Sequence, residues 1–168
     1  MRTAAQDVAQ RPQWVARLKQ LGIEMPAVPD AVATYVAAVR TGNAVITSGQ
    51  LPFVAGALPL VGRLGAEVSV EEGYRLAGSA ALNGLAAVHE LVGLDNVVRV
   101  VRVAGYVASA DGFTDQAKVL DGASHLIGEI FGTAGSHARA AIGVAWLPLN
   151  APVEVELEVE VLPDESAG

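Results

Sequence analysis

The amino-acid sequence predicts an α+β domain made of one mixed β-sheet with two long helices on one face. Valine and leucine alternate with glutamate at residues 153–162, which is typical of a strand with one buried face. A helical spacing of apolar residues follows a capping box at residues 69–72, and a valine-rich stretch at residues 96–107 indicates another strand. Because strands and helices alternate, we expect two βαβ crossovers in a single sheet.

The N-terminal third of the chain predicts a short helix and a β-hairpin. Residues 6–22 carry apolar side chains at roughly helical spacing and end at Gly22, which indicates an amphipathic helix. After an extended link, strands are expected at residues 34–39 and 44–48, because the Gly and Asn between them favour a tight turn. A third, short strand is expected at residues 60–64.

The remainder of the chain predicts two long helices and three strands. The first helix follows Ser69, which caps it, and stops at Gly93. The second helix is expected at residues 113–131, with Gly132 ending it. The strands are expected at residues 96–107, 139–145 and 153–162.

Length and composition favour a single domain that needs no disulfide bond or metal ion for its stability. The chain has 168 residues and no cysteine, which excludes thiolate chemistry and Cys-based metal sites and does not require an oxidising compartment. The formal net charge of −7 disfavours nucleic acid as a partner, since phosphate binding normally needs clustered Lys and Arg. No segment has the apolar length of a signal peptide or a membrane span, so we expect a cytoplasmic protein that does not bind membranes.

The apolar fraction is high for a monomer of this size. Hydrophobic residues make up 52% of the chain and charged residues 17%. We expect part of this apolar surface, on the sheet face that the helices leave open, to meet another subunit. A trimer that packs its sheets around a shared centre would cover that face. The alternative is that the many alanines reflect genome composition.

Arg139 is the residue whose chemistry most needs an explanation. It is the only lysine or arginine in the last fifty positions, and its neighbours are small and apolar. An unpaired guanidinium in such surroundings costs solvation. Either Arg139 forms an ion pair with a neighbouring strand, where the glutamates from Glu154 onward are the nearest acids, or it is kept for a ligand carboxylate, which its planar donors bind in two places.

Three separated motifs resemble the reactive intermediate deaminase family, also called RidA, YjgF or L-PSP. They are Tyr35-Val36 with the later RTGNAVITSGQLP at residues 40–52, then Ala138-Arg139-Ala140, and finally Leu147-Pro148 leading into VEVE at residues 153–156. The resemblance covers residues 33–162. It implies a chorismate-mutase-like homotrimer with three clefts between subunits. The expected organisation is a helix and linker at residues 1–32, the RidA-like domain at 33–163 and a tail at 164–168.

The resemblance also implies an activity and a set of site residues. Enamines and imines of 2-amino acids would be hydrolysed to 2-oxo acids and ammonia, without a cofactor or metal. Arg139 would bind the substrate carboxylate, and Glu154 would position the hydrolytic water. Substrate contacts would come from Tyr35, Ser48, Gly49 and Ala141, the last through its backbone carbonyl.

Two departures from the family pattern leave an alternative open. Gly143 replaces a common acidic residue and Trp146 a small or basic one, which alters the expected cleft. The alternative is a non-catalytic trimer that binds a small carboxylate in the same cleft. The ribonuclease activity that the L-PSP name suggests disagrees with the acidic charge. Ser48 lacks the sequence context of a nucleophile, so its hydroxyl is expected to bond either the turn or the ligand.

Expectations also follow for several other polar residues. Arg99 and Arg102 are candidates for cross-strand pairs with the glutamates of the last strand. The three histidines lack metal-binding spacing, and His137 is a candidate for approaching Arg139. Asp121 aligns roughly with an asparagine of the family and is given no role.

Overall fold

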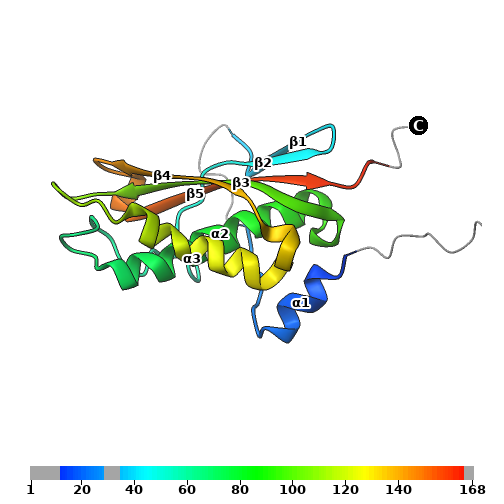
Figure 1. Ribbon diagram of the computed structural model, residues 1–168, viewed down its shortest axis with the longest axis horizontal. Helices are drawn as coiled ribbons and strands as arrows, with labels where there is room; N and C mark the ends of the chain where they lie inside the picture. Colours follow the sequence, from blue (N-terminus) through cyan, green and yellow to red (C-terminus); the bar gives the residue numbers. More distant parts are fainter. Residues whose placement is uncertain (1–11, 29–34, 165–168) are drawn as a thin grey trace, which may run out of the picture.

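Five strands form one mixed sheet in the computed structural model, which describes residues 12–28 and 35–164, and the two long helices cover one face of it (Figure 1). The sheet order is β1-β2-β5-β3-β4. The elements in chain order are α1 (Trp14–Gln20), β1 (Ala38–Thr41), β2 (Ala44–Thr47), α2 (Val70–Val92), β3 (Val97–Ala108), α3 (Gln116–Phe131), β4 (Ala138–Val144) and β5 (Val153–Val161).

Strand β5, the last in the chain, lies inside the sheet between β2 and β3. It is antiparallel to both neighbours, while β3 and β4 are parallel and are connected through α3. Strands β2 and β3 therefore point the same way and are connected through α2. This arrangement confirms the predicted α+β fold with its two crossovers. It also leaves β1 and β4 as the two edges of the sheet.

The capping box predicted for α2 is present in full. Ser69 Oγ accepts a hydrogen bond from Glu72 N at 3.2 Å, and Glu72 Oε2 accepts one from Ser69 N at 2.8 Å. These contacts satisfy backbone donors that the first turn of a helix leaves open. At the other end the chain leaves the helix at Gly93, whose φ of +79° favours glycine.

Two predicted strands are wrong in extent. The first strand is Ala38–Thr41 rather than residues 34–39, because a two-residue turn at Gly42-Asn43 lets β1 pair with β2 up to Thr41. Residue 34 lies outside the described residues. Residues 60–64 form no strand; there Leu64 alone makes isolated bridges. The positive φ angles of Gly62 and Gly65 interrupt the extended backbone on both sides of it.

The two helix starts also differ from prediction. Helix α3 begins at Gln116 rather than at Phe113, because Phe113 belongs to the preceding turn and donates its N–H to Ala110 O at 3.1 Å. Helix α1 is confirmed but short, at Trp14–Gln20, and the predicted start at residue 6 lies outside the described residues. Of the helices in the described ranges, none has the length and apolarity needed to cross a bilayer.

Helix α1 packs against α3 and the start of β3. Trp14 donates from Nε1 to Val97 O at 2.8 Å, and its ring meets that of Phe131 edge-on at 5.0 Å between centroids. Arg17 Nε donates to Glu129 O at 3.0 Å. An aromatic ring that also satisfies its polar atom makes a strong anchor, so α1 is held firmly to the domain.

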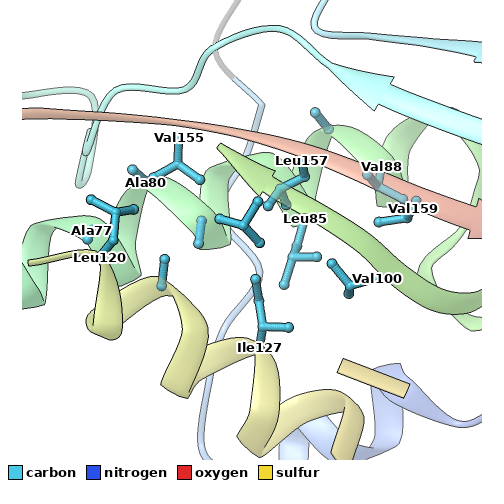
Figure 2. Close-up of a cluster of buried hydrophobic side chains, with 14 of the residues drawn as sticks. Ala77, Ala80, Leu85, Val88, Val100, Leu120, Ile127, Val155, Leu157 and Val159 are labelled. Carbon is cyan, nitrogen blue, oxygen red and sulfur yellow. The ribbon is translucent and has the colours of Figure 1, made fainter. Parts of the chain in front are cut away.

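The core lies between the sheet and the two long helices (Figure 2). The apolar residues of β5 point into it, where they meet side chains such as Leu85 of α2 and Leu120 and Ile127 of α3. The glutamates of β5 therefore lie on the open face, as the alternation predicts. There the register sets Arg102 opposite Glu158 and Arg99 opposite Glu160, as the predicted cross-strand pairs require.

The close approach of α2 and α3 depends on Gly122. A Cβ at this position would overlap the backbone carbonyl of Tyr74, which cannot rotate away. We expect Gly122→Ala to lower the free energy of unfolding by about 1–3 kcal/mol, because the helices must move apart. Chemical denaturation measures this. Gly128→Ala on the same helix, where nothing lies within 4 Å of a new Cβ, is the control and should keep or raise stability. Equal losses in both variants would contradict the packing argument.

Candidate functional site

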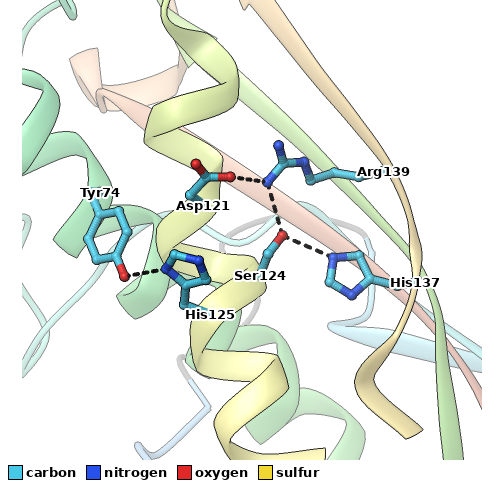
Figure 3. Close-up of polar contacts among 6 residues, drawn as sticks. All are labelled: Tyr74, Asp121, Ser124, His125, His137 and Arg139. Atoms are coloured by element: carbon cyan, nitrogen blue, oxygen red, sulfur yellow. Dashed lines mark hydrogen bonds and ion pairs between the residues drawn. The ribbon is translucent and has the colours of Figure 1, made fainter. Parts of the chain in front are cut away.

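Arg139 lies on the edge strand β4, on the side that faces α3 (Figure 3). Its Nη1 atom donates to Asp121 Oδ1 at 2.8 Å and to Ser124 Oγ at 3.0 Å. The hypothesis of an ion pair with a glutamate of the neighbouring strands is therefore wrong: the acid comes from the helix below the sheet. Asp121 and Ser124 are one helical turn apart, which is why one nitrogen reaches both.

The Nε and Nη2 donors of Arg139 have no hydrogen-bond partner within residues 12–28 and 35–164. Within the part of the chain that the structure describes, the contacts of this guanidinium with other side chains all involve Nη1. The Arg139 side chain is 25% exposed. The edge formed by Nε and Nη2 is thus open to another group. Such an edge can donate two parallel hydrogen bonds to the two oxygens of a carboxylate.

His137 joins the Arg139 cluster through Ser124. Its Nε2 lies 3.0 Å from Ser124 Oγ, and its Nδ1 lies 2.6 Å from the carbonyl oxygen of Gly135. The other two histidines have different partners: His125 Nδ1 lies 2.7 Å from the Tyr74 hydroxyl, and Leu94 N donates to His89 Nδ1. Among the described residues no three acidic or histidine side chains gather in a way that would hold a metal ion.

Glu154 lies on the opposite, open face of the sheet, against Gly49. Backbone hydrogen bonds in both directions between Gln50 and Val155 bring these segments together. The Glu154 side chain occupies the space where a Cβ of residue 49 would be. Burial raises the pKa of the Glu154 carboxyl above its ordinary value, and the charge of Glu156 raises it further.

Ser48 and Tyr35 adjoin the Glu154 position. Ser48 Oγ donates to Val36 O at 2.6 Å, so the hydroxyl bonds the local backbone, which was one of the two expected alternatives. The hydroxyl oxygen can still accept a hydrogen bond from a ligand. Tyr35, next to Val36, is 55% exposed. Ser48, Gly49 and Glu154 therefore form one group of candidate residues, and Tyr35 lies beside it.

Within one chain the candidate residues fall into two groups. Ala141 lies on β4 with Arg139, packs against the core and faces Gly105 in the register. Arg139 and Ala141 thus point to the helix side, whereas Glu154 points to the open side, and strand β3 separates β4 from β5. A single chain does not bring Arg139 to Glu154.

Tyr106 is a neighbour of Glu154 that sequence reasoning missed. The register of β3 and β5 sets it directly opposite Glu154, and its hydroxyl donates to Glu156 Oε2 at 3.3 Å. Burial and the nearby charge of Glu156 raise the pKa of the Tyr106 phenol. The alternation within residues 96–107 shows only that Tyr106 lies on one of the two faces of the sheet. The pairing of β3 with β5 is what brings Tyr106 next to Glu154 and Glu156.

The two departures from the family pattern lie at different places. Gly143 is on the helix side of β4, where a Cβ would meet the side-chain amide of Gln116. Trp146 follows β4, is 62% exposed and stacks on the guanidinium of Arg63, whose Cζ is 4.8 Å from the ring centroid. A side chain at position 143 would require the end of the Gln116 side chain to move.

A mixed sheet backed by two helices, with an arginine on an edge strand and a half-buried glutamate on the open face, defines the molecule as a small α+β protein with a candidate carboxylate-binding site. A family model described as "YjgF/chorismate mutase-like, putative endoribonuclease" matches residues 15–161, and the chain belongs to that family. The resemblance carried by the sequence motifs is thereby confirmed.

Individual relatives agree with this assignment. Protein TCP17 of Trypanosoma cruzi is 42% identical over 148 residues, which span 87% of this chain and 92% of the relative. The crystal structure of Atu1372 from Agrobacterium tumefaciens is 40% identical, with a TM-score of 0.82 and coverage of 89% of this chain and 92% of that one. TdcF of E. coli, solved with bound serine, is 24% identical, with a TM-score of 0.59 and coverage of 83% and 97%; it shares the fold.

Proposed function

We propose that the protein hydrolyses reactive enamines and imines of 2-amino acids to 2-oxo acids and ammonia, without a cofactor, in a cleft between the subunits of a cytoplasmic homotrimer. The observation that carries this proposal is that no residue in the described part of the chain occupies the Nε–Nη2 edge of Arg139. A guanidinium fixed at one nitrogen, with a second donor edge open, is suited to a small carboxylate. Membership of the YjgF family supports the same choice.

The two groups of candidate residues favour a site completed by a second copy. Arg139 is on an edge strand of the sheet and Glu154 is on its open face. In the proposed trimer, Arg139 of one subunit binds the substrate carboxylate next to Glu154 of another. The open face also exposes large apolar side chains, which a subunit contact would cover: Val39, Ile46 and Ile142.

The proposed reaction needs little more than orientation and one base. An enamine first gains a proton at carbon and loses one from nitrogen to become the imine. Glu154 then takes a proton from a bound water as the water oxygen attacks the imine carbon, and it returns this proton to the nitrogen, which gives a carbinolamine. Transfer of the hydroxyl proton through Glu154 to the amino group then breaks the C–N bond and releases ammonia. Burial raises the pKa of Glu154, which makes the carboxylate a better proton acceptor than an exposed one. The product is the 2-oxo acid.

Small 2-imino acids are the substrates to test first. The serine bound to TdcF is an amino acid of that size, and dehydration of serine yields 2-aminoacrylate. We would generate 2-aminoacrylate in place with a dehydratase, and bulkier imines with an amino-acid oxidase, and follow release of the 2-oxo acid. Wild type should accelerate release, as should Arg75→Ala on the exposed side of α2, which serves as the control.

Three outcomes separate the hypotheses. Faster 2-oxo acid release supports the deaminase. A trimer without turnover that is stabilised by pyruvate in an Arg139-dependent manner supports the non-catalytic carboxylate binder instead. Cleavage of RNA by protein that remains after stringent purification, and its loss in Arg139→Ala, would support the ribonuclease that the family description suggests.

Gly49→Ala tests whether the glutamate position matters. The new Cβ would displace the Glu154 carboxylate, which can swing away because it ends a flexible side chain. We expect kcat to fall about 10–100-fold, since small misplacements of a reacting group are costly, with little change in Tm. Steady-state kinetics and thermal unfolding measure the two quantities, with Gly128→Ala as the control. A fall in Tm that matches the loss of activity would mean that Gly49 serves the fold instead.

A further inference from the structure

Ser124 and His137 form a hydrogen-bonded chain that ends on Arg139 (Figure 3). Ser124 Oγ accepts from Arg139 Nη1 at 3.0 Å and lies 3.0 Å from His137 Nε2. On the far side of the imidazole ring, Nδ1 lies 2.6 Å from Gly135 O. The chain thus links the segment before β4 to the guanidinium through one residue of α3.

The groups at the two ends of this chain fix where the protons lie. The Gly135 carbonyl only accepts, so His137 Nδ1 carries a proton. The guanidinium only donates, so the Ser124 oxygen accepts from it. The single hydroxyl proton of Ser124 can then go to the bare Nε2 of a neutral His137. In the Nδ1–H tautomer every donor of the chain therefore faces an acceptor.

We propose that Ser124 and His137 are positioning residues that hold Arg139 in the orientation that binds a carboxylate. This inference rests on the proposed carboxylate-binding role of Arg139. Arg139 Nη1 donates one hydrogen bond to Asp121 and one to Ser124. Because the hydroxyl proton of Ser124 points to His137, a lone pair of the Ser124 oxygen stays turned towards Arg139 Nη1. A planar fork fixed in advance loses less freedom when the ligand binds, so affinity for the carboxylate rises.

Removing the hydroxyl should weaken binding of the carboxylate more than it slows the reaction. For Ser124→Ala we expect about a tenfold rise in KM for 2-aminoacrylate and in Kd for pyruvate, the effect of one hydrogen bond to a charged group, with kcat nearly unchanged. Ser124→Thr keeps the hydroxyl and should restore most of the affinity. Ser79→Ala is the matched control, because Ser79 Oγ bonds the Arg75 carbonyl of its own helix.

Two substitutions of His137 separate its hydrogen bonds from its bulk. His137→Gln offers one acceptor for Ser124 and one donor for the Gly135 carbonyl, like the neutral ring, so pyruvate affinity should remain near wild type. His137→Ala should weaken it to the extent that Ser124→Ala does. His125→Ala is the control on α3, since His125 contacts Tyr74 instead. Calorimetric titration gives the Kd for pyruvate of wild type and of the three variants.

The nitrogen spectrum of the imidazole gives a readout that does not depend on activity. In labelled wild type, His137 should show a protonated Nδ1 and a bare Nε2, and the balance should shift in Ser124→Ala. A protonated Nε2 with bare Nδ1, or an unchanged Kd for pyruvate in Ser124→Ala, would overturn the inference. If imine hydrolysis is absent but pyruvate affinity still follows Ser124 and His137, the positioning role stands and the proposed reaction fails.

Discussion

Replacing Arg139 by alanine is expected to lower kcat/KM for 2-imino acids about 100- to 10,000-fold, mainly by raising KM. Two charge-assisted hydrogen bonds to the substrate carboxylate are lost, and each contributes about 1.5–3 kcal/mol. Stability should change little, because Asp121, the partner left behind, is 43% exposed in its side chain and can be solvated. Initial rates over a range of imine concentrations, together with Tm, measure both effects.

Arg139→Lys refines this expectation. Lysine keeps the charge but not the planar fork, so it should recover only a small part of the lost kcat/KM. Arg75→Ala, on α2, controls for the loss of a surface cation. An unchanged KM in Arg139→Ala would mean that the carboxylate is bound elsewhere, and the proposed function would lose its main support.

Replacing Glu154 by glutamine should abolish most of the turnover and at the same time stabilise the fold. Glutamine cannot take a proton from water, so we expect kcat to fall about 100- to 10,000-fold with a smaller change in KM. Partial burial and the nearby charge of Glu156 make the ionised Glu154 carboxylate destabilising in the folded state, and a neutral amide at this position removes that destabilisation. At pH 7, Tm should therefore rise by on the order of 1–3 °C.

The pH dependence of the free energy of unfolding follows from the direction in which the pKa of Glu154 is shifted. The pKa of the Glu154 carboxyl is raised in the folded protein above its ordinary value of 4.5, so the folded state binds the proton more tightly than the unfolded state. The resulting stabilisation is complete below pH 4.5 and is lost as the pH rises through the folded pKa. Glu154→Gln should remove this loss, which denaturation between pH 4 and pH 8 would measure.

A matched variant shows whether these effects belong to the Glu154 position or to any glutamate on this face of β5. Glu160 lies on the same face but is exposed, so Glu160→Gln should change neither kcat nor Tm appreciably. If Glu154→Gln lowers Tm, the carboxylate stabilises the fold through a contact that outweighs its burial. If kcat survives in Glu154→Gln, another group activates the water, and Tyr106, directly opposite in the register, is the first to examine.

The sequence by itself determined the elements whose causes are local. The capping box at Ser69 and Glu72 sets the start of α2 through bonds within one turn, and the alternation in β5 assigns its valines to the core. The turn at Gly42 also follows from its own residues, although the strand before it runs from Ala38 to Thr41 and not over residues 34–39. Local patterns give an element and its faces but not its partners.

Tertiary structure alone decided which residues meet. The acid that pairs with Arg139 is Asp121, on a helix whose face toward β4 depends on how α3 packs, and not a glutamate nearer in the chain. The register of β4 and β5 against β3 puts Arg139 and Glu154 on opposite faces of the sheet, and β3 lies between their two strands. Such pairings follow from packing between distant segments, and the energy of that packing is not encoded in the spacing of neighbouring residues.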